Sequence, residues 1–193
     1  MQLVNIHTHR PTGSHIEPVS FGIHPWSADG DFGMLAADRF ADVEAVGETG
    51  LDFACNTPRE RQEELFRAHL KIAAEIGKPV ILHCVRAFEP MMKILEEYPL
   101  RAVIFHGFTG SRQQAERAVA RDYMLSFGDR TFRSPRAVGA LQFTPLRNLF
   151  LETDDSDTQI ETVYQSAAEV KGLALNELRE AIIDNYKRIF NRK

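Results

Sequence analysis

The sequence is poor in cysteine: Cys55 and Cys84 are the only two among 193 residues. They do not form a Cys-x-x-Cys pair, and two cysteines are too few for a disulfide framework, so a reducing, cytoplasmic environment is expected. No secretory signal pattern precedes Leu3, and no apolar run is long enough to span a bilayer. These absences argue against a disulfide-rich secreted scaffold and against a membrane partner.

An excess of positive charge is also missing. The formal net charge is -4, and no cluster of Lys and Arg resembles the footprint of a nucleic-acid-binding surface. We therefore expect no strong affinity for nucleic acid. This does not exclude a metal enzyme that cleaves a phosphodiester, because bound metal ions supply positive charge themselves.

The chain lacks linkers, low-complexity stretches and internal repeats. With 44% apolar residues it is long enough to bury a sizeable core, so residues 1–193 are expected to form a single domain. It also lacks the Gly-rich fingerprint of a dinucleotide-binding fold, which weakens the alternative of an open doubly wound sheet.

Short apolar runs alternate with helical patterns along the chain. Helices are predicted from a capping box at Thr57-Pro58-Arg59-Glu60 to Ile76, and over residues 89–98, 111–121, 158–170 and 176–190. Strands are predicted at residues 3–6, 19–23, 44–46, 80–82, 102–105, 123–127 and 148–151. The alternation predicts βαβ units, an α/β fold and a parallel sheet. A shortened TIM-like (β/α) barrel with seven strands instead of eight fits best.

Two histidines follow the first of these runs, in His7-Thr8-His9. Side chains two residues apart lie on the same face of a strand, so both imidazoles can point to one place. Later strand-like runs also end in residues whose side chains can bind a metal ion. In a parallel barrel the carboxyl ends of the strands meet on one face, where catalytic residues lie.

Together these positions make a candidate set of metal ligands: His7, His9, Glu48, His83, His106 and Asp154. Imidazoles mixed with carboxylates suit Zn, Mn, Co or Ni better than Ca, which prefers oxygen alone; Mg stays among the candidates. Six ligands exceed the needs of one tetrahedral ion. The set therefore predicts two divalent ions with one bridging carboxylate.

The chain resembles the TatD family of metal-dependent hydrolases, within the amidohydrolase-like superfamily. Matching stretches occur in family order along the whole chain: His7-Thr8-His9, Gly22-Ile23-His24-Pro25, Gly47-Glu48-Thr49-Gly50-Leu51-Asp52, Pro79-Val80-Ile81-Leu82-His83, His106-Gly107-Phe108-Thr109-Gly110-Ser111, Leu151-Glu152-Thr153-Asp154 and Asn185-Tyr186-Lys187-Arg188-Ile189-Phe190.

The resemblance implies roles for the six candidate ligands. His7 and His9 would bind one ion together with Glu48 and Asp154. Glu48 would bridge to a second ion, completed by His83 and His106. Asp154 would also orient or deprotonate the attacking water, so that Glu48 and Asp154 are the expected catalytic carboxylates.

The chain departs from the family pattern in two places. Only residues 10–21 separate His9 from Gly22, where family members usually carry a helix and a strand, so one βα unit is missing after the first strand. Asp154 leads directly into a helical pattern, without the usual Pro-rich substrate loop. A missing unit would expose a barrel edge, and an exposed edge favours pairing into a homodimer.

The resemblance implies a divalent-metal-dependent hydrolase of deoxyribonuclease type, which cleaves phosphodiesters with a metal-activated water. The alternatives are an esterase or phosphoesterase for small molecules and a metal-binding barrel without activity. A histidinol-phosphatase type of enzyme ranks lower, because Asp154-Asp155-Ser156 lacks the histidine of its Asp-x-His motif. His24 is either a substrate contact or a hydrogen-bonded loop histidine, and the sequence does not decide between them.

Overall fold

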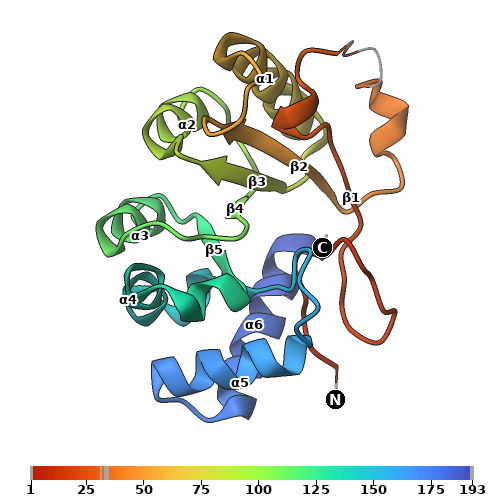
Figure 1. The fold of residues 1–193 in the computed structure, drawn as a ribbon. Helices are drawn as coiled ribbons and strands as arrows, with labels where there is room; N and C mark the ends of the chain where they lie inside the picture. The colour runs from red at the N-terminus through yellow and green to blue at the C-terminus, as the bar shows by residue number, and fades with distance from the viewer. Residues whose placement is uncertain (1, 31, 33–34, 192–193) are drawn as a thin grey trace. The chain divides into compact units, whose positions relative to one another are not determined.

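The computed structural model describes residues 2–30, 32 and 35–191. The chain divides into two compact units: residues 1–18 with 106–193, here called unit 1, and residues 19–105, here called unit 2. Figure 1 labels their helices and strands. The expectation of one domain over residues 1–193 stays a prediction.

Unit 2 is built from neighbouring parallel strands and covering helices. Each strand pairs in parallel with the next along the chain, and α1 packs against β2. The elements are β1 (Ser20–Phe21), η1 (Pro25–Ser27), η3 (Ala37–Phe40), β2 (Ala45–Asp52), α1 (Arg59–Ile76), β3 (Val80–Val85), α2 (Phe88–Leu95) and β4 (Val103–Phe105).

Unit 1 pairs β5 with β6, again in parallel. Its elements are α3 (Arg112–Val119), β5 (Met124–Phe127), η4 (Asp129–Arg133), α4 (Pro135–Phe143), η5 (Leu146–Asn148), β6 (Leu149–Leu151), α5 (Ile160–Lys171) and α6 (Leu175–Phe190). The N-terminal segment joins this unit, because Ile6 N donates to Leu151 O at 3.1 Å.

Six of the seven predicted strands are regular strands, and the seventh, residues 3–6, makes only an isolated bridge from Val4 to Ile16. Too few ladder hydrogen bonds form there to define a strand. Residues 10–19 contain no helix, as expected from the missing βα unit. The α/β class with parallel strands is confirmed.

Three local expectations were wrong. The predicted capping box does not cap α1: the N-cap is Pro58, without a side-chain hydrogen bond, and the Thr57 hydroxyl donates to Trp26 O instead. Strands β2 and β3 are longer than predicted, so Glu48 and His83 lie inside strands and not after them. Helix α4 was missed, although Ser134 before Pro135 is a typical helix start and Ser134 does cap the helix.

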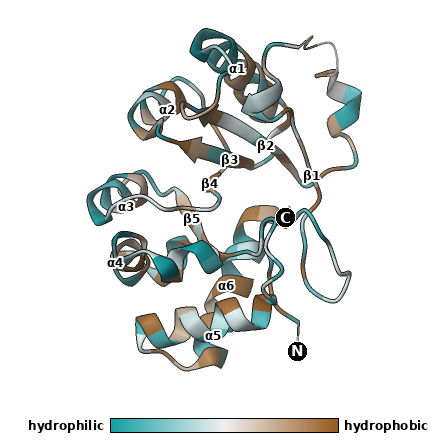
Figure 2. Ribbon diagram, in the orientation of Figure 1, coloured by the Kyte–Doolittle hydropathy of each residue, from teal (hydrophilic) through white to brown (hydrophobic). Residues whose placement is uncertain are grey.

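Apolar side chains form the interior of each unit. The inner face of α1 buries Leu65, Phe66, Leu70 and Ala73, and in Figure 2 β3 is brown whereas much of α1 is teal. In unit 1, the buried Tyr164 of α5 donates its hydroxyl to Val4 O at 2.9 Å. Among the residues that the structure describes, no helix has both the length and the apolar character needed to cross a membrane.

Candidate functional site

In unit 1, the predicted ligands His7, His9 and Asp154 come together. A short backbone ladder aligns their segments: His9 N donates to Asp154 O at 3.0 Å, and Asp154 N donates to His7 O at 3.1 Å. Asp154 follows β6 and adopts a φ of 54°, a left-handed conformation that Asp tolerates better than most residues. The ligand atoms of the three side chains lie within 4.8 Å of one another.

The spacing of these atoms fits a metal ion. His9 Nε2 lies 3.4 Å from Asp154 Oδ1, and His7 Nε2 lies 3.9 Å from the same oxygen. Ligands of a tetrahedral zinc ion with bonds of about 2.1 Å are separated by about 3.4 Å. Two imidazole nitrogens and a carboxylate oxygen are also a common donor set for such ions.

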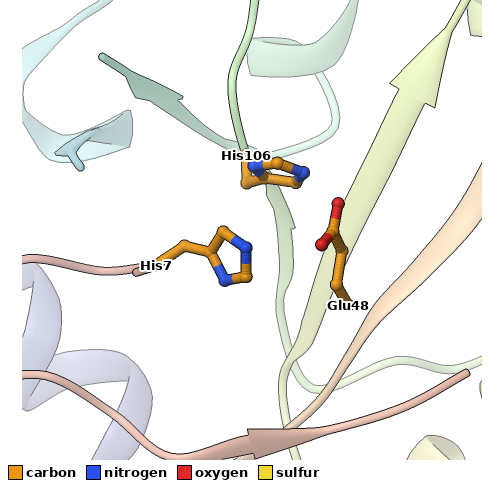
Figure 3. Close-up of side chains that lie close together, drawn as sticks. All are labelled: His7, Glu48 and His106. Atoms are coloured by element: carbon orange, nitrogen blue, oxygen red, sulfur yellow. The ribbon is translucent and has the colours of Figure 1, made fainter. Parts of the chain in front are cut away.

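His106 lies beside this group. Its ring centroid is 4.5 Å from that of His7, and Figure 3 shows the two imidazoles side by side. The carboxylate of the buried Glu152 lies against His106, with Oε1 3.2 Å from its Nδ1, and accepts from Gly107 N at 2.6 Å. A carboxylate behind a ligand histidine fixes the ring and raises its basicity.

The other carboxylate oxygen of Glu152, Oε2, is suited to contact a cation. This oxygen is buried and makes no hydrogen bond with the described residues, and His106, Glu152 and Asp154 form a further group of potential ligands. A buried carboxylate oxygen without a donor is costly unless an ion or water satisfies it. The residues present in unit 1 therefore fit a divalent metal.

The two carboxyl groups of this cluster have opposite pKa shifts. Burial is the largest influence on Asp154 and raises its pKa, and Glu152 acts in the same direction, whereas His106 and His7 oppose it. Burial also acts to raise the pKa of Glu152, but His106 and His7 outweigh it and the pKa is lowered. Without a cation nearby, Glu152 is the carboxylate that keeps its charge more readily.

In unit 2, Glu48 and His83 face each other on the adjacent strands β2 and β3. His83 Nδ1 lies 2.8 Å from Glu48 Oε1, a hydrogen-bonding distance. His24 Nε2 lies 3.4 Å from the same oxygen, and the rings of His24 and His83 are 4.4 Å apart. His24, Glu48 and His83 thus form a second group with the donor types of a metal site.

Behind His83 lies Asp52. Asp52 Oδ2 is 3.2 Å from His83 Nε2 and accepts from Trp26 Nε1 at 2.7 Å. Burial acts to raise the pKa of Asp52, but the hydrogen bonds from Trp26 and from the Ala54 amide outweigh it and lower the pKa. An ionised Asp52 holds the His83 ring in place, as Glu152 does for His106.

Two glycines let β2 approach β3 closely. A Cβ on Gly47 would lie 2.4 Å from Ile81 O, and a Cβ on Gly50 would lie 2.1 Å from His83 O. Their φ values of 148° and 144° are also unfavourable for other residues. Glycine at these positions therefore allows Glu48 to sit directly beside His83.

The predicted ligands are thus distributed over both units: His7, His9, His106 and Asp154 in unit 1, and Glu48 and His83 in unit 2. The sequence left His24 as either a substrate contact or a hydrogen-bonded loop histidine. Its Nδ1 does accept a hydrogen bond, from Trp26 N at 3.3 Å, and its ring also lies beside Glu48 and His83. Glu152 and Asp52 were missed. Glu152 lies two residues before Asp154, and Asp52 lies four residues after Glu48. In an extended chain, an even spacing places each of them on the same face as its neighbouring ligand.

A family model described as "TatD related DNase" matches residues 14–191. The chain belongs to the TatD family. Like other members it is a metal-dependent hydrolase. It is 31% identical to the "Uncharacterized metal-dependent hydrolase YcfH" of Escherichia coli K12, over 89% of this chain and 73% of that protein. The family match begins after His7 and His9, whose place in the cluster rests on the geometry given above.

Other TatD-family proteins extend the comparison. The crystal structure of YjjV, a TatD homologue from Escherichia coli K12, superposes with a TM-score of 0.82 at 30% identity and covers 92% of this chain and 78% of that one. The "3'-5' ssDNA/RNA exonuclease TatD" of Salmonella typhimurium is 37% identical over 69% of this chain, which spans 55% of that enzyme's length.

Proposed function

We propose that this TatD-family hydrolase cleaves phosphodiester bonds of single-stranded nucleic acid with the help of two divalent metal ions. The observation that carries the proposal is the grouping of His7, His9 and Asp154, whose ligand atoms lie within 4.8 Å of one another. The name of the Salmonella typhimurium relative, a single-stranded DNA and RNA exonuclease, supports the choice of substrate.

The proposed ligands follow the two clusters. His7, His9 and Asp154 bind one ion, and Glu48 and His83 bind the other, with His24 as an additional ligand suggested by its 3.4 Å distance from Glu48 Oε1. His106, which Glu152 holds in place, is also a ligand, and the family resemblance assigns it to the second ion. The bridging role of Glu48 stays a prediction based on the family. The homodimer stays a prediction based on the exposed barrel edge, and the identity of the two ions stays open among Zn, Mn, Mg, Co and Ni.

The side chains supply the remaining chemistry. Bound divalent ions would polarise the phosphoryl group and make a water molecule more acidic. The Asp154 carboxylate, beside His7 and His9, would orient the attacking water and accept its proton. Glu152 and Asp52 keep His106 and His83 in the orientation in which they bind metal.

Metal content tests the ligand assignment. Elemental analysis should give about two divalent ions per chain for the wild-type protein, and fewer for His7→Ala and Glu48→Ala. His15→Ala is a matched control, because His15 pairs with Glu161 outside every candidate group. Wild-type metal content in both ligand variants would refute the assignment.

Hydrolysis tests the reaction itself. The metal-loaded protein should shorten a single-stranded oligonucleotide, and His7→Ala should lose this activity while His15→Ala keeps it. Cleavage of small phosphate esters without cleavage of any oligonucleotide would favour the small-molecule alternative. Metal binding without turnover of either substrate would contradict a hydrolytic role.

A further inference from the structure

Trp26 is exposed and yet firmly held. Among the residues that the structure describes, it is one of two exposed large hydrophobic residues, with 61% of its surface accessible. Its indole N–H donates to Asp52 Oδ2 at 2.7 Å, and its carbonyl accepts from the Thr57 hydroxyl at 3.0 Å. Its amide donates to His24 Nδ1 at 3.3 Å. A tryptophan whose indole is hydrogen-bonded while most of the residue stays exposed needs an explanation beyond packing.

The ring stands next to the metal-ligand candidates of unit 2. Its centroid is 4.6 Å from the His24 ring and 6.2 Å from the His83 ring, in edge-to-face geometry. The Asp52 carboxylate that binds the indole also lies against His83 Nε2. The orientation of the ring is therefore linked through one carboxylate to a histidine of the candidate site.

We propose that the exposed face of Trp26 is a stacking platform for a nucleobase adjacent to the phosphodiester that is cleaved. This inference rests on the proposed function and assigns part of its substrate recognition. The indole N–H is already bonded to Asp52, so the ring offers its π-face and no base-specific hydrogen bond. Stacking of this kind accepts any base.

The fixed ring also favours binding on energetic grounds. A mobile surface tryptophan would lose rotamer freedom when a base stacks on it, whereas the hydrogen bond to Asp52 has already restricted this ring. The surroundings also suit a nucleotide, because only a sugar separates a base from its phosphate. A base on Trp26 would keep its phosphate near His24 and His83.

The chain contains a single tryptophan, so its intrinsic fluorescence reports on Trp26 alone. The probes are thymidine 5′-monophosphate and deoxyribose 5-phosphate, which share the phosphate and sugar but differ in the base. Neither contains a phosphodiester, so neither is consumed. With the metal-loaded protein, we expect quenching by the nucleotide only, and binding on the order of tenfold tighter than that of the sugar phosphate.

Calorimetry extends the comparison to variants without the indole. Trp26→Ala should bind both probes equally, and Trp26→Phe, which keeps an aromatic face, should recover part of the preference. Val19→Ala is the matched control, since Val19 is the other exposed large hydrophobic residue, and it should keep the full preference. Equal binding of the probes by the wild type, or an unchanged preference in Trp26→Ala, would overturn the platform.

Cleavage assays separate this inference from the proposed function. Trp26→Ala should raise KM on the order of tenfold for an ordinary oligonucleotide and leave KM unchanged for one that is abasic at the cleaved end. Loss of the Trp26 bond to Asp52 would change kcat for both oligonucleotides alike. An equal rise in KM for both oligonucleotides would refute the platform. A wild-type protein that prefers thymidine 5′-monophosphate but cleaves neither oligonucleotide would refute the proposed function alone.

Discussion

Asp154 is tied to its neighbours through its backbone and its side chain at once. Its amide and carbonyl bond to the His7 and His9 segment, which fixes where the carboxylate can point. The same carboxylate faces both histidines, so it is placed to bind an ion and to act on a water held there. Asparagine keeps one ligand oxygen of the same shape but cannot accept a proton at neutral pH.

The substitution Asp154→Asn should therefore reduce turnover more than metal binding. We expect kcat to fall by roughly 10²–10⁴-fold, the range attributed to a positioned acid or base, with most of the metal retained. Parallel measurements of kcat and metal content check this. Turnover near the wild-type rate would refute the role of Asp154 as proton acceptor.

For single residues, the sequence predicted which side chains could bind metal better than it predicted which side chains contact one another. His7 and His9 could be paired because alternate residues share a face, and they do meet at Asp154. Glu152 and Asp52 could not be assigned in the same way, because a carboxylate that supports a histidine looks like any other carboxylate until its distance is known. The platform proposed for Trp26 could not be predicted either, since it depends on the exposure of Trp26 and on its bond to Asp52.

Between elements, His69 joins α1 to the segment that follows β1. Its Nδ1 donates to Leu65 O, and its Nε2 accepts from Ile23 N at 2.9 Å. The bond from Ile23 N requires the neutral ring, because a protonated Nε2 cannot accept a hydrogen bond. Burial lowers the pKa of His69 to about 4, although the Leu65 carbonyl acts to raise it.

The stability of the fold should therefore fall in mild acid. Because the folded-state pKa of about 4 is below the unfolded value of about 6.5, the unfolded chain binds more protons between these pH values. The contribution of His69 is complete above about pH 6.5 and is lost as pH falls through 4, by about 3 kcal/mol in total. Urea unfolding at pH 7, 5.5 and 4 measures this loss.

The variant His69→Gln isolates this contribution from that of other titrating groups. It should be less stable than the wild type at pH 7, where it lacks the two matched hydrogen bonds, but should lose less stability as the pH falls. Parallel curves of unfolding free energy against pH for the two proteins would contradict the assigned protonation state.

Helix positions were easier to predict than helix starts. Helices α5 and α6 begin within two residues of the expected positions, and Gly172 ends α5 in a left-handed conformation. The start of α1 was misassigned because Thr57 has two possible acceptors and uses the distant one, Trp26 O. Local rules cannot rank a cap against a partner that is brought close only by folding.

For the whole molecule, the clearest expectation concerns metal ions and stability. His7 and Asp154 lie far apart in the sequence and meet within unit 1, so an ion bound to both would link these two segments in the folded state only. A ligand at one hundred times its Kd stabilises a protein by about 2.7 kcal/mol. Removal of metal should lower the unfolding temperature accordingly.

Thermal unfolding with and without EDTA measures this effect. The wild type should lose several degrees on chelation, and His7→Ala should lose less, because one site is already impaired. His15→Ala should behave as the wild type does. An unfolding temperature that does not respond to EDTA in the wild type would contradict metal binding at this cluster.

At this scale the α/β class and the parallel strand order within unit 2 followed from the alternation of runs and helical patterns. The absence of a βα unit after the first strand was also predictable from the sequence, because the segment of residues 10–19 is too short to hold a helix and a strand, and it contains no helix. The sequence could not predict how irregular residues 3–6 would be, because the number of ladder bonds there depends on Leu151 and Ile16.

The contacts of the N-terminal segment also have a consequence for biosynthesis. Val4 bonds to Tyr164, which lies 160 positions later, and the His7 and His9 backbone pairs with Asp154. A ribosome therefore releases the first two ligands long before it makes their anchors. The His7, His9 and Asp154 cluster can be assembled only after Asp154 has been made, so a chain stopped before β6 would carry these histidines without the segment that holds them.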